Sequence, residues 1–389
     1  MNKILIYSPG AYQLYGHSYD YTKGLSESFI ELGYEVFVFG IEGPLKFNDP
    51  INEIKISKSN KPIEKVTLFQ KIKWGLHRLK DSYDFLKKFM NFYFSFEEKP
   101  LIIFETFEYF SLSQIIKKFS DNYFCIFHDT NFNFKQTSLL AGSYKRLARV
   151  SSKKIVKHSK KSFVHGHEMK LNFIEQMGEN YKDKIIDIPY GAPLPFKLEK
   201  DDMIKSKSQL GLNMNKNYLL SFGTLRSDKE FIPIMEALEK NSSWEWLIAG
   251  PEGDYTYNQI NILAKKYNLE NRIIIHHKFI ENKEQKLYFT AADLIINLYK
   301  PYIRHESGTA QLARAYNKPV VVSGPPDLTD YVVEKNIGWV VNDSHTLNDI
   351  LKKYVELPER DMKLIHSNIN ELAINNSWIT VAKKILSFT

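Results

Sequence analysis

Short apolar runs alternate with longer amphipathic segments along the 389 residues of the chain. The short runs are rich in β-branched and aromatic residues, which favours strands, and the longer segments repeat their apolar positions with a helical period. This alternation is typical of α/β domains with parallel sheets. We predict strands at 3–7, 35–39, 51–56, 101–104, 123–127, 162–165 and 185–189, and then at 218–222, 246–249, 272–276, 294–298, 320–323 and 338–341, with helices between most of them.

The two series of strands predict two doubly wound, Rossmann-like domains, because a chain of this length is long for a single core. A turn-rich segment separates the series: Pro189, Pro193 and Pro195, with Gly191 among them, cannot continue a helix or a central strand. We therefore expect an N-terminal domain at 1–193 and a C-terminal domain at 194–370. An amphipathic helix within 371–389 is expected to cross back onto the first domain.

Composition narrows the class of protein. The apolar fraction of 43% excludes a disordered chain, and no apolar run approaches the roughly 20 residues that span a bilayer. The start of the chain is too short in its apolar part for a signal peptide. A single cysteine, Cys125, excludes an internal disulfide and fits a reducing cytoplasm, where we expect the protein. The net charge of +8 suits an anionic substrate or membrane surface; without zinc-finger spacing or an RNA-binding aromatic signature, nucleic acid is disfavoured.

A candidate anion site lies in the second half of the chain. The apolar run 294–298 is followed by Ser307, Gly308 and Thr309, which lead into a predicted helix at 310–316. Free N–H groups and the dipole at a helix start favour a phosphate or carboxylate, and Gly308 lets the backbone approach it closely. Arg226 and Lys229 follow the strand at 218–222, and two cations beside a helix start indicate a diphosphate and hence a nucleotide ligand.

An apolar stripe also stands out in the first domain, where two interpretations remain open. Its residues recur at spacings of three and four, as in an amphipathic helix. Residues 61–90 contain eight lysines and arginines but only three acidic residues. The stripe either packs on the sheet, with the lysines as its solvated face, or lies on an anionic membrane. Its members are Phe69, Ile72, Leu76, Leu79, Tyr83, Leu86 and Met90.

Several motifs resemble those of the retaining GT-B glycosyltransferases, in particular glycosyltransferase family 4. Residues 222–229 resemble the family's Phe-Gly-x-Ile-Arg-x-x-Lys-Gly, with Glu230 in place of the last glycine, and residues 291–299 resemble its Ala-Ala-Asp strand. The segment from Ser307 to Pro319 resembles a subgroup that carries Ser-Gly before the helix. In the first half, His128 with the following aspartate and the linker 188–192 also match the family.

The resemblance implies a GT-B fold, in which the first domain binds a glycan or lipid-linked acceptor and the second binds a nucleotide diphosphate-sugar. It implies transfer with retention and, since no Asp-x-Asp motif is present, without a metal or other cofactor, in the assembly of a surface polysaccharide or glycoconjugate. The implied catalytic residues are His128, Arg226, Lys229 and Glu306. The implied diphosphate-binding residues are Gly16 (with His17 beside it), Arg226, Lys229, Ser307, Gly308 and Thr309, and the nucleotide base is expected at Phe279 and Ile280.

The chain departs from the family at one glutamate, and this keeps other functions open. Many members carry two glutamates separated by seven residues, but eight residues after Glu306 stands Arg314, and counting back from Pro319 places Leu312 at the second position. A non-catalytic GT-B-shaped subunit and a nucleotide-sugar epimerase are the alternatives. Three acids after strands offer a catalytic base that would suit inversion instead: Glu105, Glu108 and Asp129.

Overall fold

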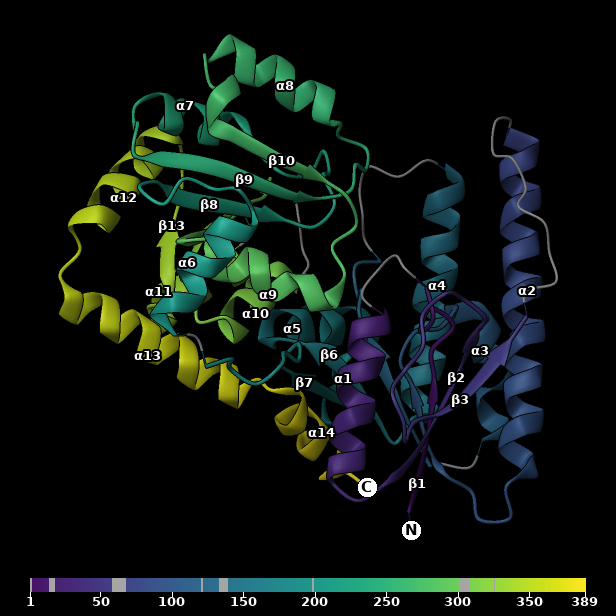
Figure 1. Ribbon diagram of the computed structural model, residues 1–389. Helices are drawn as coiled ribbons and strands as arrows, with labels where there is room; N and C mark the ends of the chain where they lie inside the picture. The colour runs from purple at the N-terminus through teal and green to yellow at the C-terminus, as the bar shows by residue number, and fades with distance from the viewer. Residues whose placement is uncertain are drawn as a thin grey trace. The chain divides into compact units, whose positions relative to one another are not determined.

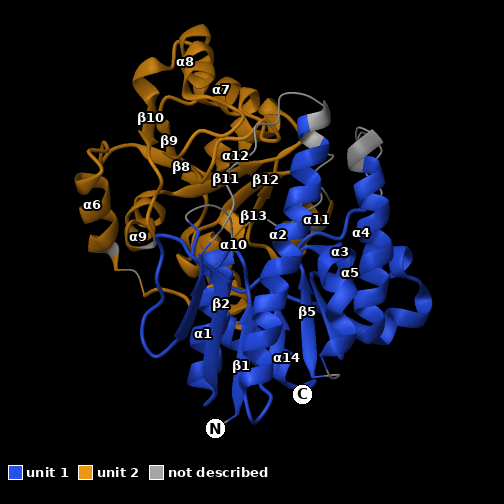
Figure 2. Cartoon of the chain, turned by 90° about the vertical axis from the view of Figure 1, so that its right-hand side faces the viewer, with its two compact units in different colours: residues 1–191, 378–389 blue, residues 192–377 orange. Residues whose placement is uncertain are grey.

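The computed structural model describes residues 2–13, 18–57, 68–119, 122–132, 139–197, 199–300, 308–324 and 326–389. The chain forms two compact units, one of residues 1–191 with 378–389 and the other of residues 192–377 (Figure 2). The first unit thus ends two residues before the break that we predicted after 193. Residues 371–377, which we grouped with the last helix, lie in the second unit.

Unit 1 contains a parallel sheet of seven strands in the order β3-β2-β1-β4-β5-β6-β7 (Figure 1). Each β1 residue pairs in register with β2 and most also with β4, so that β1 is central. The strands are β1 (Lys3–Tyr7), β2 (Glu35–Ile41), β3 (Asn52–Ile56), β4 (Leu101–Phe104), β5 (Tyr123–Phe127), β6 (Lys161–His165) and β7 (Ile185–Ile188). The helices are α1 (Ser18–Glu31), α2 (Leu68–Ser95), α3 (Tyr109–Ile115), α4 (Leu139–His158), α5 (His167–Met177) and α14 (Trp378–Leu386), with 3-10 turns η1 (Ile116–Lys118) and η2 (Glu179–Lys184).

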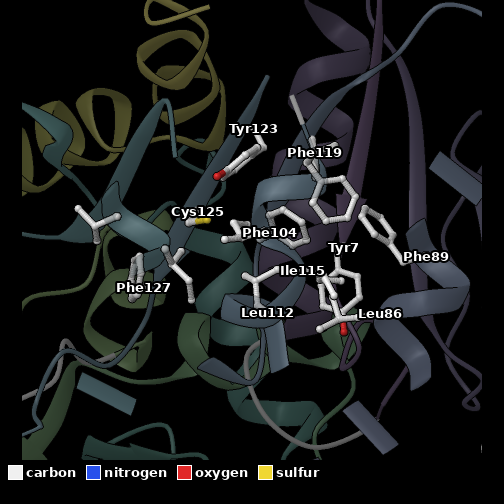
Figure 3. Packing of buried hydrophobic residues seen from close by; sticks show 14 of the residues in the cluster. Tyr7, Leu86, Phe89, Phe104, Leu112, Ile115, Phe119, Tyr123, Cys125 and Phe127 are labelled. Atoms are coloured by element: carbon white, nitrogen blue, oxygen red, sulfur yellow. The ribbon is translucent and has the colours of Figure 1, made fainter. Parts of the chain in front are cut away.

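Alternate side chains of β1 enter two separate cores of unit 1, as the pleat of a strand buried on both faces requires. Ile4 and Ile6 pack towards α1 and α14, whereas Leu5 and Tyr7 pack towards α2, α3, α4 and α5. The second of these cores is rich in aromatic rings; Figure 3 shows Phe89 among Tyr7, Phe104 and Phe119. These cores fix the strands whose carboxyl ends carry the candidate residues of this unit.

The last helix belongs to unit 1 because Trp378 fills a space that two glycines leave open. A Cβ on Gly24 of α1 would lie 2.3 Å from the Trp378 ring, and one on Gly191 would lie 2.0 Å from it. Further along α14, Val381, Ala382 and Ile385 are buried in the same core as α1. The Trp378 ring therefore packs directly against the backbone at Gly24 and Gly191 and anchors α14 in unit 1.

Unit 2 contains a parallel sheet of six strands in the order β10-β9-β8-β11-β12-β13. The strands are β8 (Asn217–Phe222), β9 (Trp244–Gly250), β10 (Ile273–His277), β11 (Leu294–Leu298), β12 (Val320–Ser323) and β13 (Gly338–Val340). One face is covered by α7, α8 and α12, and the other by α9, α10, α11 and α13. The helices are α6 (Lys200–Gln209), α7 (Ile232–Glu239), α8 (Tyr257–Lys266), α9 (Asn282–Ala291), α10 (Gly308–Ala315), α11 (Pro326–Lys335), α12 (Ser344–Glu356) and α13 (Glu359–Asn375), with a 3-10 turn η3 (Glu270–Arg272).

The predicted fold class is confirmed, because the two sheets are parallel throughout and are covered by helices on both faces. A strand is present at each predicted range, and the ends differ by no more than two residues. No helix in the described part of the chain is both long enough and apolar enough to cross a membrane.

The two halves of the apolar stripe on α2 differ in burial, so the two interpretations that the sequence left open apply to different parts of the helix. In the second half of α2, Leu86 is fully buried, and Tyr83 and Met90 pack against the aromatic core. In the first half, Ile72 is 41% exposed and Leu76 is 65% exposed. Packing on the sheet therefore accounts for only the second half of the helix.

Candidate active site

The loop after β8 is held against the end of β11 by backbone hydrogen bonds. The N–H of Glu230 donates to the carbonyl of Leu298 at 2.9 Å, and the N–H of Lys300 donates to the carbonyl of Asp228 at 2.9 Å. At the start of the loop, Gly223 adopts a φ of +88°, which glycine accepts without strain. These bonds give the two cations of the loop a fixed position at the carboxyl edge of the sheet, where open α/β sheets bind ligands.

Arg226 is oriented by a carboxylate that the sequence analysis did not single out. Asp228 accepts a hydrogen bond from Nε of Arg226 at 3.1 Å and lies 2.8 Å from Nη2. This two-point contact fixes the plane of the guanidinium, as expected for a fork of N–H groups facing a carboxylate. The Arg226 side chain remains 41% exposed. The spacing Arg-x-Asp was a visible signal in the sequence, but acids that orient cations look like ordinary loop residues.

Lys229 is directed towards the backbone at the end of β8. Its Nζ donates to the carbonyl of Thr224 at 3.2 Å and to that of Phe222 at 3.5 Å. Burial, and then the positive charge of Arg226, lower the pKa of Lys229 to about 8, while Asp228 opposes the shift. An anion bound here would offset both effects, so this lysine is chemically suited to a negatively charged ligand.

The start of α10 meets Lys229 at the same carbonyl oxygen. Oγ1 of Thr309 donates to the carbonyl of Phe222 at 3.4 Å, which is the oxygen that Nζ of Lys229 also contacts. No described atom lies within 4 Å of the Cβ that a residue other than glycine would have at Gly308. The structure therefore brings Lys229, Thr309 and the positive end of the α10 dipole together.

Other predicted residues are placed elsewhere or lie outside the described part of the chain. Glu306 and Ser307, and likewise Gly16 and His17, lie outside the described residues. Ile280 is 5% exposed and belongs to the core below α9 and α10, so only its backbone is available to a nucleotide base. Phe279 is 43% exposed.

Arg314, which replaces the family's second glutamate on one alignment, serves packing within unit 2. It is 4% exposed, donates from Nη1 to Oε1 of Gln311 at 2.6 Å, and its guanidinium lies 4.8 Å from the ring centre of Tyr331. Leu312, the residue at that position on the other alignment, packs against the core. Neither side chain offers a carboxylate to a ribose.

In unit 1, four strand ends bring together a hydrogen-bonded cluster around His128. Nε2 of His128 lies 2.9 Å from Oε1 of Glu105, and Nδ1 of His128 lies 3.1 Å from Nε2 of His165. Glu105 is fully buried, and its Oε2 accepts hydrogen bonds from Oγ of Ser8 at 2.7 Å and from Oγ1 of Thr106 at 2.9 Å. His128 itself is 12% exposed at the side chain. Three of these five residues were not foreseen, although each follows or ends a strand, which is the signal that could have found them.

Two of the three acids that the sequence offered as a base have other roles. Glu108 caps α3, where its carboxylate accepts from the N–H of Ser111 at 2.7 Å, and it also accepts from the hydroxyl of Tyr144 at 2.8 Å. Glu105 is enclosed in the cluster described above. Asp129 is exposed and accepts from the N–H of Asn131 at 2.8 Å. Among the described residues, no group of three or more His, Cys, Asp or Glu side chains is arranged to hold a metal ion.

Unit 2 matches a known family of proteins. Residues 202–370 match the family model of the Glycosyl transferases group 1. This segment lies within unit 2, so unit 2 contains a glycosyltransferase group 1 domain. A comparison with the curated proteins finds no match.

Solved structures match the whole chain at low sequence identity. Sucrose-phosphate synthase from Thermosynechococcus elongatus is 17% identical with a TM-score of 0.75, over 100% of this chain and 98% of that one. A glycosyltransferase from Rickettsia africae is 18% identical with a TM-score of 0.71, over 99% and 97% of the two chains. HepE of Anabaena, solved with UDP-glucose, is 15% identical with a TM-score of 0.68, over 100% and 99%. The two units are thus the two Rossmann-like domains of the GT-B fold.

Proposed function

We propose that this chain transfers a sugar from a nucleotide diphosphate-sugar to a glycan or lipid-linked acceptor, in the assembly of a surface polysaccharide or glycoconjugate. The observation that carries the proposal is the meeting of Lys229 and Thr309 at the carbonyl of Phe222, beside Arg226 and the start of α10. Positive charge at this place stabilises the negative charge that develops on a departing diphosphate, which lowers the barrier to transfer without a metal.

Uridine is the base to test first. Two of the structural relatives were solved with uridine nucleotides, HepE with UDP-glucose and an Escherichia coli protein with UDP-2-fluoro glucose. A thermal-shift series with UDP, GDP and ADP, and then with their sugars, would identify the donor, because a ligand at about 100 times its Kd stabilises the native state by about 2.7 kcal/mol. We expect one of the three nucleotides to raise the melting temperature of the wild type. This shift should disappear in the R226A/K229A double variant. A series in which no nucleotide shifts the melting temperature would contradict it.

Retention is the stereochemical course that we propose. An inverting transferase needs a base near the acceptor hydroxyl. In unit 1, Glu105 is buried and Glu108 caps a helix, which supports retention over a reaction that uses either of them as the base. Proton NMR of the first product formed from an α-linked donor distinguishes the two courses. An α-linked product is expected, and a β-linked product would show inversion.

We further propose that the first half of α2 contacts an anionic membrane from the cytoplasmic side. Ile72 and Leu76 are exposed there, and Lys73 and Lys80 are exposed beside them on the same helix. Apolar side chains flanked by lysines bind the interface of anionic lipids. The wild-type protein should sediment with vesicles of phosphatidylglycerol but not with vesicles of phosphatidylcholine. The L76E variant should sediment with neither. Equal sedimentation with both lipids would remove this proposal.

A further inference from the structure

Glu105 is an unusual residue to bury in a strand end of a parallel sheet. Its side chain is fully buried, and taking a carboxylate out of water costs several kcal/mol unless it is paired and hydrogen-bonded. Oγ of Ser8 and Oγ1 of Thr106 both donate to its Oε2, and Oγ1 of Thr22 donates in turn to Oγ of Ser8 at 3.0 Å. These two hydroxyl donors offset part of the cost of burying the carboxyl group.

The other carboxylate oxygen faces His128, and a second imidazole faces the far side of that ring. Oε1 of Glu105 lies 2.9 Å from Nε2 of His128, while Nε2 of His165 lies 3.1 Å from Nδ1 of His128. His165 is 3% exposed. Among the described residues, two titratable side chains from other elements pack on the pair: Tyr21 of α1, whose ring centre is 4.7 Å from that of His128, and Tyr190, 5.0 Å from His165.

We propose that Glu105 and His165 are positioning residues that hold the ring of His128 from both sides. Glu105 keeps a proton on Nε2, and His165 binds at Nδ1, so that the tautomer and the ring plane are set before any substrate arrives. The inference rests on the proposed function, for which the family resemblance implies that His128 is a catalytic residue. Because both ring nitrogens contact protein groups, His128 acts as a fixed ring at the edge of the sheet and does not remove the acceptor proton.

Kinetics test the positioning through variants on two different strands. E105Q keeps the size and one acceptor but loses the charge, and a ring displaced by about 1 Å is expected to lower kcat about 100-fold with little change in the donor KM. H165L removes the contact at Nδ1 and should have a similar effect. H165Q restores an N–H donor at that point and should recover most of kcat. If E105Q and H165L both keep the wild-type kcat, the positioning role is wrong.

Nitrogen NMR of histidine-labelled protein gives a readout that needs no activity. The wild type should show a protonated Nε2 at His128 with its proton downfield, because Oε1 of Glu105 lies 2.9 Å from this nitrogen. E105Q should lose this signal, and H165L should shift Nδ1. E108Q is the matched control: it removes a carboxylate from the same loop and a helix cap worth about 1 kcal/mol, and should leave both the signals and kcat unchanged.

The two readouts separate this inference from the proposed function. A wild-type protein that transfers no sugar would overturn the proposed function, and the nitrogen signals would then decide the positioning alone. Persistence of the downfield proton in E105Q, with circular dichroism showing a folded protein, would overturn the positioning of His128 by Glu105.

Discussion

The carboxyl edges of the two sheets carry their polar groups in different ways. In unit 1, the cluster around His128 is enclosed: Ser8, Glu105 and His165 are buried, His128 is only 12% exposed, and the groups contact one another. In unit 2, Arg226 is partly exposed beside Asp228, and Lys229 and Thr309 contact a backbone oxygen near Gly308, whose missing Cβ would meet no described atom. An enclosed network holds its own groups in place, whereas partly exposed cations beside a helix start are suited to an anionic ligand. We therefore expect unit 1 to contribute orientation and unit 2 to contribute affinity.

The enclosed network lies next to the aromatic core of unit 1. The F89A substitution in this core should have the largest effect of the changes considered, a loss of stability of unit 1. The Phe89 ring is fully buried and lies 4.9 Å from Tyr7 and 5.6 Å from Phe104, the residue before Glu105 (Figure 3). Truncation to alanine should lower the free energy of unfolding of unit 1 by about 3–5 kcal/mol, measured by urea denaturation. F94A on the same helix, where the ring is 48% exposed, should cost less than about 1 kcal/mol. Equal losses in the two variants would contradict the assignment of this core.

Removing both cations of unit 2 should have the next largest effect. Each charge-assisted hydrogen bond to a diphosphate contributes about 1.5–3 kcal/mol, so R226A or K229A alone should lower kcat/KM by about 10- to 100-fold and the double variant by more than 100-fold. K216A is the matched control, because Lys216 is half-buried just before the amino end of β8, on the other edge of the sheet, and donates to the carbonyl of Ser242. Near-normal transfer by the double variant would remove the diphosphate site.

The pH dependence of donor binding sharpens the role of Lys229. Because burial lowers its pKa to about 8, the cation is present below that pH and is lost above it, so affinity for a nucleoside diphosphate should fall up to about tenfold per pH unit above 8. The linkage to stability has the opposite sign: between about 8 and the usual lysine value the unfolded chain binds the proton and the native state does not, so this group makes the protein more stable as pH rises. Titration calorimetry from pH 7 to 9.5 measures the change in binding.

K229R is the control for that titration. An arginine stays charged throughout this range, so its binding curve should be flat between pH 7 and 9.5. A fall in affinity above pH 8 that K229R does not abolish would assign the pH dependence to another group.

The contrast between the units also explains what the sequence allowed us to predict. The central strands could be located because strands buried on both faces leave continuous apolar runs, such as 101–104 and 294–298, bounded by polar residues. Arg226, Lys229 and the start of α10 could be proposed because each lies in a short local motif next to a strand. The prolines led us to predict a break after residue 193, and the first compact unit comprises residues 1–191 with 378–389.

The cluster around His128 could not be predicted in the same way. Its members Ser8, Glu105, His128 and His165 are separated by up to 157 positions in the chain and meet only because β1, β4, β5 and β6 are neighbours in the sheet. Glu105 was considered as a base because nothing in its local sequence shows that two hydroxyls would enclose it. Strand order and burial, which depend on the whole fold, decide such a role.

The smallest expected effect, from G308A, tests whether the open start of α10 is a binding surface or only a helix end. A methyl group at this position meets no described atom within 4 Å, and alanine is the better helix former by up to about 1 kcal/mol, so stability should stay the same or rise slightly. A phosphate that binds at the start of α10 would approach the helix through the space of this methyl group. Affinity for the donor nucleotide should therefore fall about threefold to tenfold, a loss of up to about 1.4 kcal/mol. G75A is the matched control, since Gly75 is also helical with no described atom near its missing Cβ but lies in α2 of unit 1. It should gain stability without any change in affinity, and G308A with wild-type affinity would show that the diphosphate does not bind at this helix start.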